Sequence, residues 1–263
     1  MLDRTATALS QSVIRAVSAF GYLGALLVES GYWILFGRAR GQPVKAAPLA
    51  AQMMETGVRA IPIVMVLSFA IGVSLAIQTI YALKSFGAES QVILAIAIGV
   101  TREFGPLITG ILVAGRTASA LAARIGSMVV SQEVDALRVI GIMPVRYLVV
   151  PPLVALLVMV PTLTVLADAA AIFGGAVYSL PNLDVTMWAY LVASIDVLTA
   201  SDILQGLAKS VVFGMIIALI GVSAGFSVKG GAEGVGRATT QAVVMAISWI
   251  VIADMVFTFF LNR

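Results

Sequence analysis

The chain has 263 residues, of which 60% are hydrophobic and only 11% are charged, with a formal net charge of +3. A soluble domain carries about 25% charged residues, so this composition excludes a soluble fold and indicates a single integral membrane domain. The sequence contains no cysteine and no histidine. It therefore excludes disulfides and thiolate metal sites, and it lacks the commonest general base and metal ligand.

The first apolar segment, residues 13–36, is ambiguous. Its longest charge-free run, 16–28, has only thirteen residues, which is short for crossing a bilayer. The neighbouring Tyr32 and Trp33 suit the level of the lipid headgroups. We expect an interfacial helix here, with an additional transmembrane span as the alternative.

Five later segments are apolar over about the 20 residues that a membrane-crossing helix needs. They are 60–84, 90–126, 147–178, 206–228 and 240–261. The second is long enough to project beyond the bilayer. The sequence thus predicts an all-α integral membrane protein with five transmembrane helices.

Two opposite charges, Arg102 and Glu103, interrupt the second segment, with twelve uncharged residues on either side. A charge at membrane depth costs roughly 2.5 kcal/mol or more, so it normally faces a protein interior or a substrate path. Neighbours on a helix point about 100° apart, so these two cannot satisfy each other well. Their partners are expected on another helix, another subunit or a ligand. A structural ion pair between helices is one interpretation, and a polar site in a transport pathway is the one that we favour.

Two further acidic residues, Asp168 and Asp254, lie within apolar segments. In a proton-coupled secondary transporter such residues would carry the protons. We expect instead that each is a partner of Arg116 or Arg102, or a polar group near the outer surface. Helical rise places Asp168 close to the outer interface, whereas Asp254 is deeper and its role stays open.

Residues 131–141 predict a short amphipathic helix across one end of the bundle. Ser131 is a plausible N-cap, and the acidic residues that follow favour the positive end of the helix dipole. Gly141 and Pro144 are expected to end this helix. Such a helix is either a solvated connector or an element that docks in a groove of a soluble partner. Further along, the four glycines in residues 229–237 predict a flexible connector, with Thr239 or Thr240 capping the last span.

The basic residues are distributed unevenly between the two sides of these five spans. Eleven fall on one side: Arg4, Arg15, Arg38, Arg40, Lys45, Arg59, Arg124, Arg138, Arg146, Lys229 and Arg237. Lys84, Lys209 and Arg263 fall on the other. The positive-inside rule then places the N-terminus in the cytoplasm and the C-terminus outside.

Two patterns that resemble enzyme motifs lie within apolar segments. The run from Gly110 to Thr117 nearly fits a phosphate-binding loop, but Arg116 stands where lysine is required. The run from Gly221 to Gly225 fits a nucleophile elbow, but the chain has no histidine for a triad. Small residues that allow close helix packing explain both patterns better. A ladder of such residues recurs every four positions at Ala114, Ala118, Ala122 and Gly126. We therefore expect no catalytic site.

Several motifs resemble those of the MlaE/YrbE family, the permeases of MCE-type ABC lipid transporters. They are Arg102–Pro106, Ala114–Leu121, Gln132–Leu148 and Gly234–Val244, and the similarity runs from about residue 12 to the C-terminus. The resemblance implies a non-catalytic, homodimeric permease of the bacterial inner membrane. It also implies an interfacial helix followed by five spans, and a cytoplasmic coupling helix that matches residues 131–141.

The resemblance further implies several partners. They are a separate ABC ATPase that binds ATP and Mg²⁺, an MCE-domain lipid-binding protein, a phospholipid cargo and room for a small cytoplasmic accessory subunit. No cofactor on this chain and no nucleic acid are expected. The expected lipid pathway comprises Leu75, Gln78, Ala82, Leu83, Phe86, Arg102 and Glu103. The expected ATPase-coupling residues are Gln132, Glu133, Asp135, Ala136, Leu137, Arg138 and Gly141. A proton-coupled transporter using Asp168 and Asp254, or a scaffold without transport activity, would be the alternatives.

Overall fold

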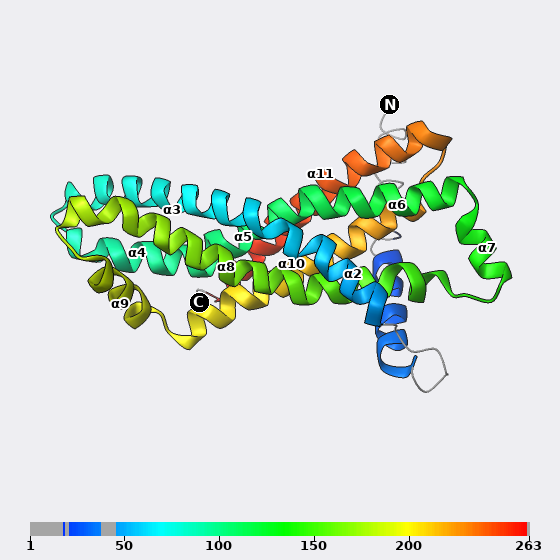
Figure 1. Cartoon of the computed structure of the whole chain (residues 1–263), viewed down its shortest axis with the longest axis horizontal. Helices are drawn as coiled ribbons and strands as arrows, with labels where there is room; N and C mark the ends of the chain where they lie inside the picture. Colours follow the sequence, from blue (N-terminus) through cyan, green and yellow to red (C-terminus); the bar gives the residue numbers. More distant parts are fainter. Residues whose placement is uncertain (1–17, 19–20, 38–45, 262–263) are drawn as a thin grey trace, which may run out of the picture.

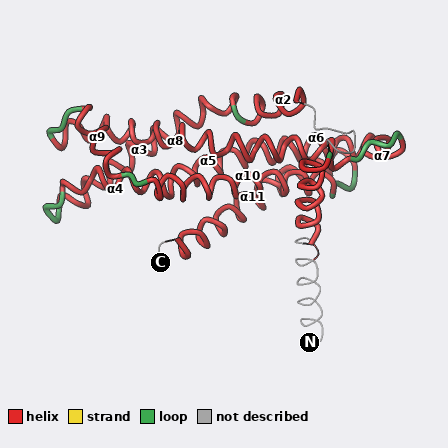
Figure 2. The backbone as a smooth tube through the Cα atoms, turned by 90° about the horizontal axis from the view of Figure 1, so that it is seen from below, coloured by secondary structure: helices red, strands yellow, loops and turns green. Residues whose placement is uncertain are grey.

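The computed structural model describes residues 18, 21–37 and 46–261 of the chain. These residues form an elongated helical bundle that contains no strand (Figures 1 and 2). The connection between α3 and α4, together with α9, lies at one end of the bundle, and α7 lies at the other (Figure 1).

Five helices are long and apolar enough to cross a membrane, as the sequence predicts. They are Ala46–Lys84, Glu89–Val130, Val145–Leu183, Ala200–Phe226 and Gly231–Phe260. The first comprises α2 (Ala46–Thr56), a 3-10 turn at Val58–Ala60 and α3 (Ile61–Lys84). The third is mainly α8 (Val150–Leu183), the fourth is α10 (Ala200–Phe226), and the fifth is α11 (Gly231–Leu261).

The second long helix is interrupted twice by π-helical turns. A 3-10 turn at Glu89–Gln91 leads into α4 (Val92–Gly99), and the π-helical segment η3 (Val100–Phe104) follows. Then come α5 (Gly105–Val113), a second π-helical segment η4 (Ala114–Ala118) and α6 (Ser119–Val130). Such π turns frequently occur at functional sites. The hydropathy pattern of the sequence does not reveal them.

The prediction of a flexible connector at residues 229–237 is wrong, because α11 already begins at Gly231. The turn before it is made by Gly230 and Gly231, both in the left-handed region that glycine adopts easily (φ 88° and 69°). Thr239 and Thr240 therefore lie inside the helix, where both donate hydrogen bonds to the Gly236 carbonyl instead of capping the span. Packing overrides the low helix propensity of the glycines, since Ala238 and Ala242 of this stretch are buried.

The N-terminal helix, Gly21–Phe36, runs across the long axis of the bundle in both views (Figures 1 and 2). Its described part is shorter than the five membrane-crossing helices, and its place at the membrane interface stays a prediction. Leu26 and Trp33 face inward, and Arg146 lies over the Trp33 ring at 6.0 Å from its centroid. Residues 13–17 and 19–20 of the expected segment fall outside the described residues.

The short helix predicted at residues 131–141 is α7 (Glu133–Val139), at the end of the bundle. Ser131 is not its N-cap: Gln132 occupies that position in a left-handed conformation, and the Ser131 hydroxyl donates to Ser127 O and Glu133 Oε1. Gly141 ends the helix as predicted, with φ 80°. Ile142 N donates to Leu137 O and Gly141 N to Arg138 O, the two bonds of a Schellman motif.

Small residues bring the helices of the core into direct backbone contact. A Cβ atom on Gly72 of α3 would lie 1.9 Å from Ala171 O of α8, and one on Gly174 of α8 would lie 2.2 Å from Phe69 O of α3. The predicted ladder of small residues on α6 and η4 is fully buried. Ala118 from this ladder faces Gly221 of α10, where a Cβ would come within 3.1 Å. These contacts are typical of helix packing in membranes.

One helix, α9 (Met187–Val197), was not expected from the sequence. Thr186 caps it by accepting a hydrogen bond from Ala189 N at 3.2 Å. Its anchor is Tyr190, which is fully buried and has its hydroxyl against Gly175 of α8. Burial raises the pKa of Tyr190 to about 12, so this residue is a neutral packing group. The helix α9 thus folds back onto the C-terminal part of α8.

Candidate functional site

The two charges singled out in the sequence, Arg102 and Glu103, lie on the π-helical segment η3. Each pairs with a residue of α10 that is more than ninety positions away in the chain. The result is a cluster of five ionic side chains contributed by η3, α10 and α11. We call this set, Arg102, Glu103, Asp202, Lys209 and Asp254, the ionic cluster.

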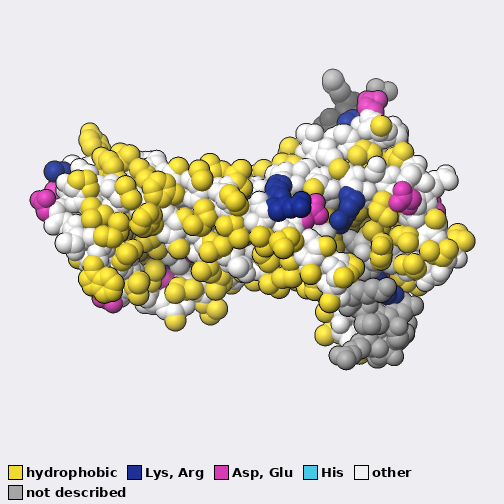
Figure 3. Space-filling model, in the orientation of Figure 1, with side chains coloured by type: hydrophobic (Ala, Val, Ile, Leu, Met, Phe, Trp, Pro, Cys, Tyr) yellow, Lys and Arg dark blue, Asp and Glu magenta, His cyan; other side chains and the backbone are white. Residues whose placement is uncertain are grey.

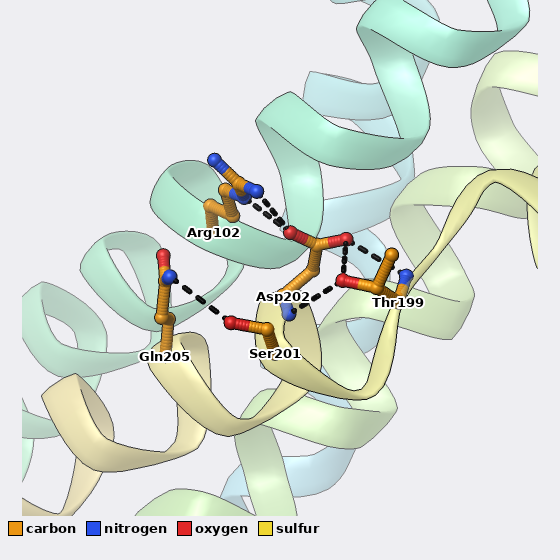
Figure 4. Close-up of polar contacts among 5 residues, drawn as sticks. All are labelled: Arg102, Thr199, Ser201, Asp202 and Gln205. Atoms are coloured by element: carbon orange, nitrogen blue, oxygen red, sulfur yellow. Dashed lines mark hydrogen bonds and ion pairs between the residues drawn. The ribbon is translucent and has the colours of Figure 1, made fainter. Parts of the chain in front are cut away.

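Arg102 pairs with Asp202 at the first turn of α10 (Figure 4). Its Nε donates to Asp202 Oδ1 at 2.5 Å, and Nη2 contacts the same oxygen. The other carboxylate oxygen of Asp202 accepts from Thr199 N at 2.8 Å and from the Thr199 hydroxyl at 2.7 Å. Asp202 N in turn donates to Thr199 Oγ1 at 3.4 Å, which completes a capping box. Asp202 is thereby satisfied on both oxygens and holds Arg102 in place.

Glu103 pairs with Lys209, which lies about two helical turns after Asp202 on α10. Lys209 Nζ lies 2.5 Å from Glu103 Oε2 and 3.0 Å from Asp254 Oδ1 of α11. The ammonium also donates to the Thr258 hydroxyl at 3.0 Å, and that hydroxyl lies 3.1 Å from both oxygens of Glu103. One buried cation therefore joins two acidic residues from two different helices.

The cluster has a buried side and an open side. The side chains of Asp202 and Lys209 are each only 2% exposed, whereas those of Arg102 and Glu103 are each 32% exposed. Three acidic and two basic groups leave one formal negative charge. The structure therefore confirms the interpretation of interhelical ion pairs. Arg102 and Glu103 nevertheless stay partly exposed at the surface of the bundle, and their buried partners Asp202 and Lys209 fix their positions.

Three of the sequence interpretations need correction here. Asp254 pairs with Lys209, not with Arg116 or Arg102. Lys209 itself lies inside the bundle and not on the outer surface, because it neutralises Glu103 and Asp254. Asp168 faces the backbone at Gly105, and its Oδ1 is buried without a hydrogen-bond partner among the described residues. It is therefore not the partner that was expected for Arg116 or Arg102.

Sequence reasoning missed Asp202 and Lys209 as members of the cluster, although both carry a local signal. Thr199 and Asp202 have the spacing of a capping box before an apolar run. Lys209 is the only charged residue between Asp202 and Lys229. The capping box marks the true start of α10 at Ala200, six residues before the expected start at 206.

The expected pathway residues of α3 fall into two groups. Gln78 and Ala82 are exposed and lie four residues apart, so they share one face of α3, and the exposed Phe86 lies in the turn that follows this helix. Leu75 and Leu83 are half-buried and pack against the hydrophobic cluster that contains Ile80 and Ile96. The structure thus separates an open face of α3 from a packed one.

The expected coupling residues are likewise divided. Gln132, Glu133, Asp135, Ala136, Arg138 and Gly141 are exposed. Leu137, in contrast, is half-buried against the main core, and Val134 is buried. The exposed apolar side chains at this end of α7 are Val139 and Ile140, at 87% and 67% exposure. These two, which the sequence analysis did not single out, give the end of α7 an open apolar surface.

Comparisons with known proteins agree with this architecture. A family model described as "Permease MlaE" matches residues 49–260. A probable ABC transporter permease protein of Rickettsia prowazekii is 35% identical over 216 residues, covering 82% of this chain and 83% of the relative. The intermembrane phospholipid transport system permease protein MlaE of Haemophilus influenzae is 30% identical over 264 residues, covering 98% and 97%.

A eukaryotic relative extends this similarity. The chloroplastic protein Trigalactosyldiacylglycerol 1 of Arabidopsis thaliana is 35% identical over 209 residues, covering 80% of this chain and 60% of the relative. With a family match over most of its length and five helices able to span a membrane, the chain is a multi-pass membrane protein that belongs to the MlaE family of ABC transporter permeases.

Proposed function

We propose that this chain is the permease subunit of an ATP-driven phospholipid transporter and that it works as a homodimer. The observation that carries the proposal is the open side of the ionic cluster, where Arg102 and Glu103 are partly exposed within an apolar bundle. A phospholipid headgroup supplies the charges that such a pair can bind. Membership in the MlaE family, and a relative named for intermembrane phospholipid transport, support this cargo.

The lipid pathway lies between two copies of the chain, along the open face of α3. Gln78, Ala82 and Phe86 form a mostly apolar wall for acyl chains, and Leu75 and Leu83 support that wall from behind. Arg102 and Glu103 meet the headgroup. Because Asp202 and Lys209 hold these two side chains from behind, the site is preorganised and binding requires little reordering.

A separate ABC ATPase binds ATP and Mg²⁺ and drives the cycle through α7. The exposed polar residues of this helix, together with Val139 and Ile140, form the docking surface. An MCE-domain protein exchanges lipid with the permease at the opposite end, and a small cytoplasmic subunit can accompany the ATPase. The protein resides in the bacterial inner membrane, with its N-terminus in the cytoplasm and its C-terminus in the periplasm, because the order of the spans in the sequence assigns most basic residues to the side that carries α7.

One observation favours a different mechanism, a secondary transporter in which Asp168 carries a proton. Its buried Oδ1 has no hydrogen-bond partner among the described residues, and such intramembrane acids often serve proton transfer. Asp254 fits this role less well, because Lys209 lies 3.0 Å from its carboxylate. The two mechanisms differ in what drives them, ATP hydrolysis or a proton gradient.

The decisive experiment purifies the permease with its neighbouring subunits, reconstitutes them in liposomes and follows a fluorescent phospholipid. We expect ATP-dependent lipid transfer that survives an uncoupler of the proton gradient. The double variant Arg102→Gln/Glu103→Gln should transfer lipid at a small fraction of this rate, because the exposed charges no longer bind the headgroup. Assembly of the subunits should remain normal.

The matched control is Glu89→Gln, which removes a surface carboxylate whose ion pair with Lys84, at 4.0 Å, is largely exposed. It should transfer lipid at the wild-type rate. Wild-type transfer by the double variant would remove the headgroup assignment. Transfer that needs a proton gradient but no ATP would establish the secondary transporter instead.

A further inference from the structure

A second polar site lies in the other half of the molecule, between α2 and the helix formed by η4 and α6. Two neighbouring cavities of about 90 and 300 Å³ share Gln52, Glu55 and Arg124 as lining residues. The smaller cavity is also lined by Thr56, Arg116, Thr117, Ala120 and Leu121. The larger one continues along an apolar wall that includes Met128, Leu148, Pro151 and Pro152.

The charged side chains that line this site are exposed. These are Arg116, Arg124 and Glu55. Within residues 18, 21–37 and 46–261, no ion pair involves any of these three side chains. In Figure 3, a few basic and acidic side chains gather on an otherwise hydrophobic face. Buried polar side chains back the site, since Gln52, Thr56 and Thr117 are each 5% exposed or less.

Helix packing gives the depth of the site. Gly225 of α10 packs against Ile125 and Gly221 against Ala118, so α6 and the last turns of α10 lie side by side. Arg124 is therefore level with the end of α10 at Phe226, on the side proposed to be cytoplasmic. Arg116 lies eight residues deeper, or about 12 Å by helical rise. The site thus reaches from the headgroup level into the apolar part of the inner leaflet.

Ordinary snorkelling of arginine to the interface accounts for only part of this arrangement. It explains Arg124, but it does not explain a deeper arginine on a π-helical turn that lines the same cavity as a carboxylate. Two cations and one anion around one cavity match the charges of a zwitterionic headgroup, in which a phosphate lies next to an ammonium. Guanidinium groups bind phosphate oxygens in a planar, bidentate manner.

We infer that this cavity binds the phosphoethanolamine headgroup of an inner-leaflet phospholipid. Arg116 and Arg124 hold the phosphate and Glu55 accepts the ammonium, while the acyl chains extend past Arg116 toward the middle of the bilayer. The site is distinct from the ionic cluster, since Arg116 and Arg102 are fourteen residues apart, about 21 Å by helical rise. The identity of the lipid rests on the proposed function, whereas the anion-binding pair does not.

Native mass spectrometry of the purified permease complex tests the inference with three lipids of identical chains. These are phosphatidylethanolamine, phosphatidylglycerol and uncharged diacylglycerol. We expect wild-type protein to retain phosphatidylethanolamine best and diacylglycerol least. In the Arg102→Gln/Glu103→Gln background, which removes binding at the ionic cluster, adding Arg116→Gln/Arg124→Gln should weaken phosphatidylethanolamine binding roughly tenfold or more, because charge-assisted hydrogen bonds are lost. Glu55→Gln should retain the phosphate contact and shift the preference toward phosphatidylglycerol.

Arg59→Gln is the matched control, because Arg59 is exposed nearby but lines neither cavity. It should leave all three affinities unchanged. If the combined variant fails to fold, the change of preference in Glu55→Gln and the weaker phosphate binding of Arg116→Lys decide the question. Unchanged binding in a folded combined variant overturns the site. Loss of the dimer with lipid binding intact also overturns it, and identifies this face as the contact between copies.

The assignments of lipid binding to the ionic cluster and to this cavity can be tested independently. Arg102→Gln/Glu103→Gln should lose transfer and the lipid bound at the ionic cluster but keep the lipid bound at this cavity, which adding Arg116→Gln/Arg124→Gln should then remove. Failure of the proposed transport function would leave the anion-binding result standing. Lipid binding that disappears only in the Arg102 and Glu103 variant would instead show that the ionic cluster is the sole lipid site, and would refute the inference.

Discussion

Lys209 is the residue on which the ionic cluster depends most. Its side chain is 2% exposed and neutralises both Glu103 and Asp254. Removing one partner of a buried ionic group leaves an uncompensated charge, which costs far more than the intact pair contributes. Lys209 therefore fixes the position of α10 relative to both η3 and α11.

The first prediction follows from this burial. Lys209→Met should lower the free energy of unfolding by about 3–5 kcal/mol, because Glu103 and Asp254 lose their shared cation. The measurement is the midpoint of thermal unfolding in detergent, with Lys84→Met as the control at an exposed ion pair. The triple variant Lys209→Met/Glu103→Gln/Asp254→Asn should recover part of the loss. Equal stability of Lys209→Met and wild type would contradict the ion pairing.

At the level of single residues, the sequence identified one half of the cluster and not the other. Arg102 and Glu103 could be predicted because two charges within an apolar run must have partners. Those partners, Asp202 and Lys209, could not be assigned, because a single sequence does not tell which of several distant charges meet in space. Asp254 illustrates the same limit, since two arginines were plausible partners and a lysine is the actual one.

At the scale of the helix, α3 and α8 show how glycine determines packing. Gly72 and Gly174 each leave room for a backbone segment of the opposite helix. Apolar side chains alone cannot distinguish a lipid-facing position from a helix contact in a membrane, so small residues carry that information. The ladder on α6 could be recognised by its regular spacing, whereas the isolated Gly72 and Gly174 could not.

The second prediction uses this contact. Gly72→Ala should destabilise the protein by about 1–3 kcal/mol, because the new Cβ would lie 1.9 Å from Ala171 O and force the helices apart. Gly99→Ala is the control, since no atom lies within 4 Å of a Cβ there. It should be neutral or stabilising by up to about 1 kcal/mol. Similar unfolding midpoints for the two variants would show that the α3–α8 contact is looser than described.

The third prediction concerns α7. Val139→Asp/Ile140→Asp should reduce the amount of ATPase that co-purifies with the permease, because both side chains are exposed and apolar at the proposed docking surface. Leu137→Asp should instead impair folding, because Leu137 packs against the core. Normal stoichiometry and ATPase activity in the double variant would place the docking surface elsewhere.

Helix boundaries were the least predictable feature at this scale. The glycines in residues 229–237 favoured a connector, but burial of neighbouring alanines makes the segment helical. The two π-helical turns escaped prediction as well, since they change the hydrogen-bond register of the backbone without altering the apolar pattern. Both the ionic cluster and the proposed headgroup site include residues of these turns.

For the whole molecule, hydropathy was sufficient to predict five spanning helices, and the charge asymmetry predicts their direction. A chain without cysteine allows a direct test of that direction. Ser90→Cys lies at the α3–α4 end and Ser131→Cys at the α7 end, and both positions are exposed. We expect a membrane-impermeant maleimide to label position 90 in intact spheroplasts and position 131 only after lysis. The reverse accessibility would overturn the topology.

The central claim is that Arg102 and Glu103 face a headgroup site between two copies of the chain and not bulk acyl chains. Electron paramagnetic resonance of a spin label at Glu103→Cys, in the assembled transporter in liposomes, tests it most directly. The control label is at Val251→Cys, an exposed apolar position of α11. We predict that a water-soluble nickel reagent relaxes the label at position 103 more strongly than oxygen does, with the opposite order at position 251. Dominant relaxation by oxygen at position 103 would place this residue in lipid and contradict the account.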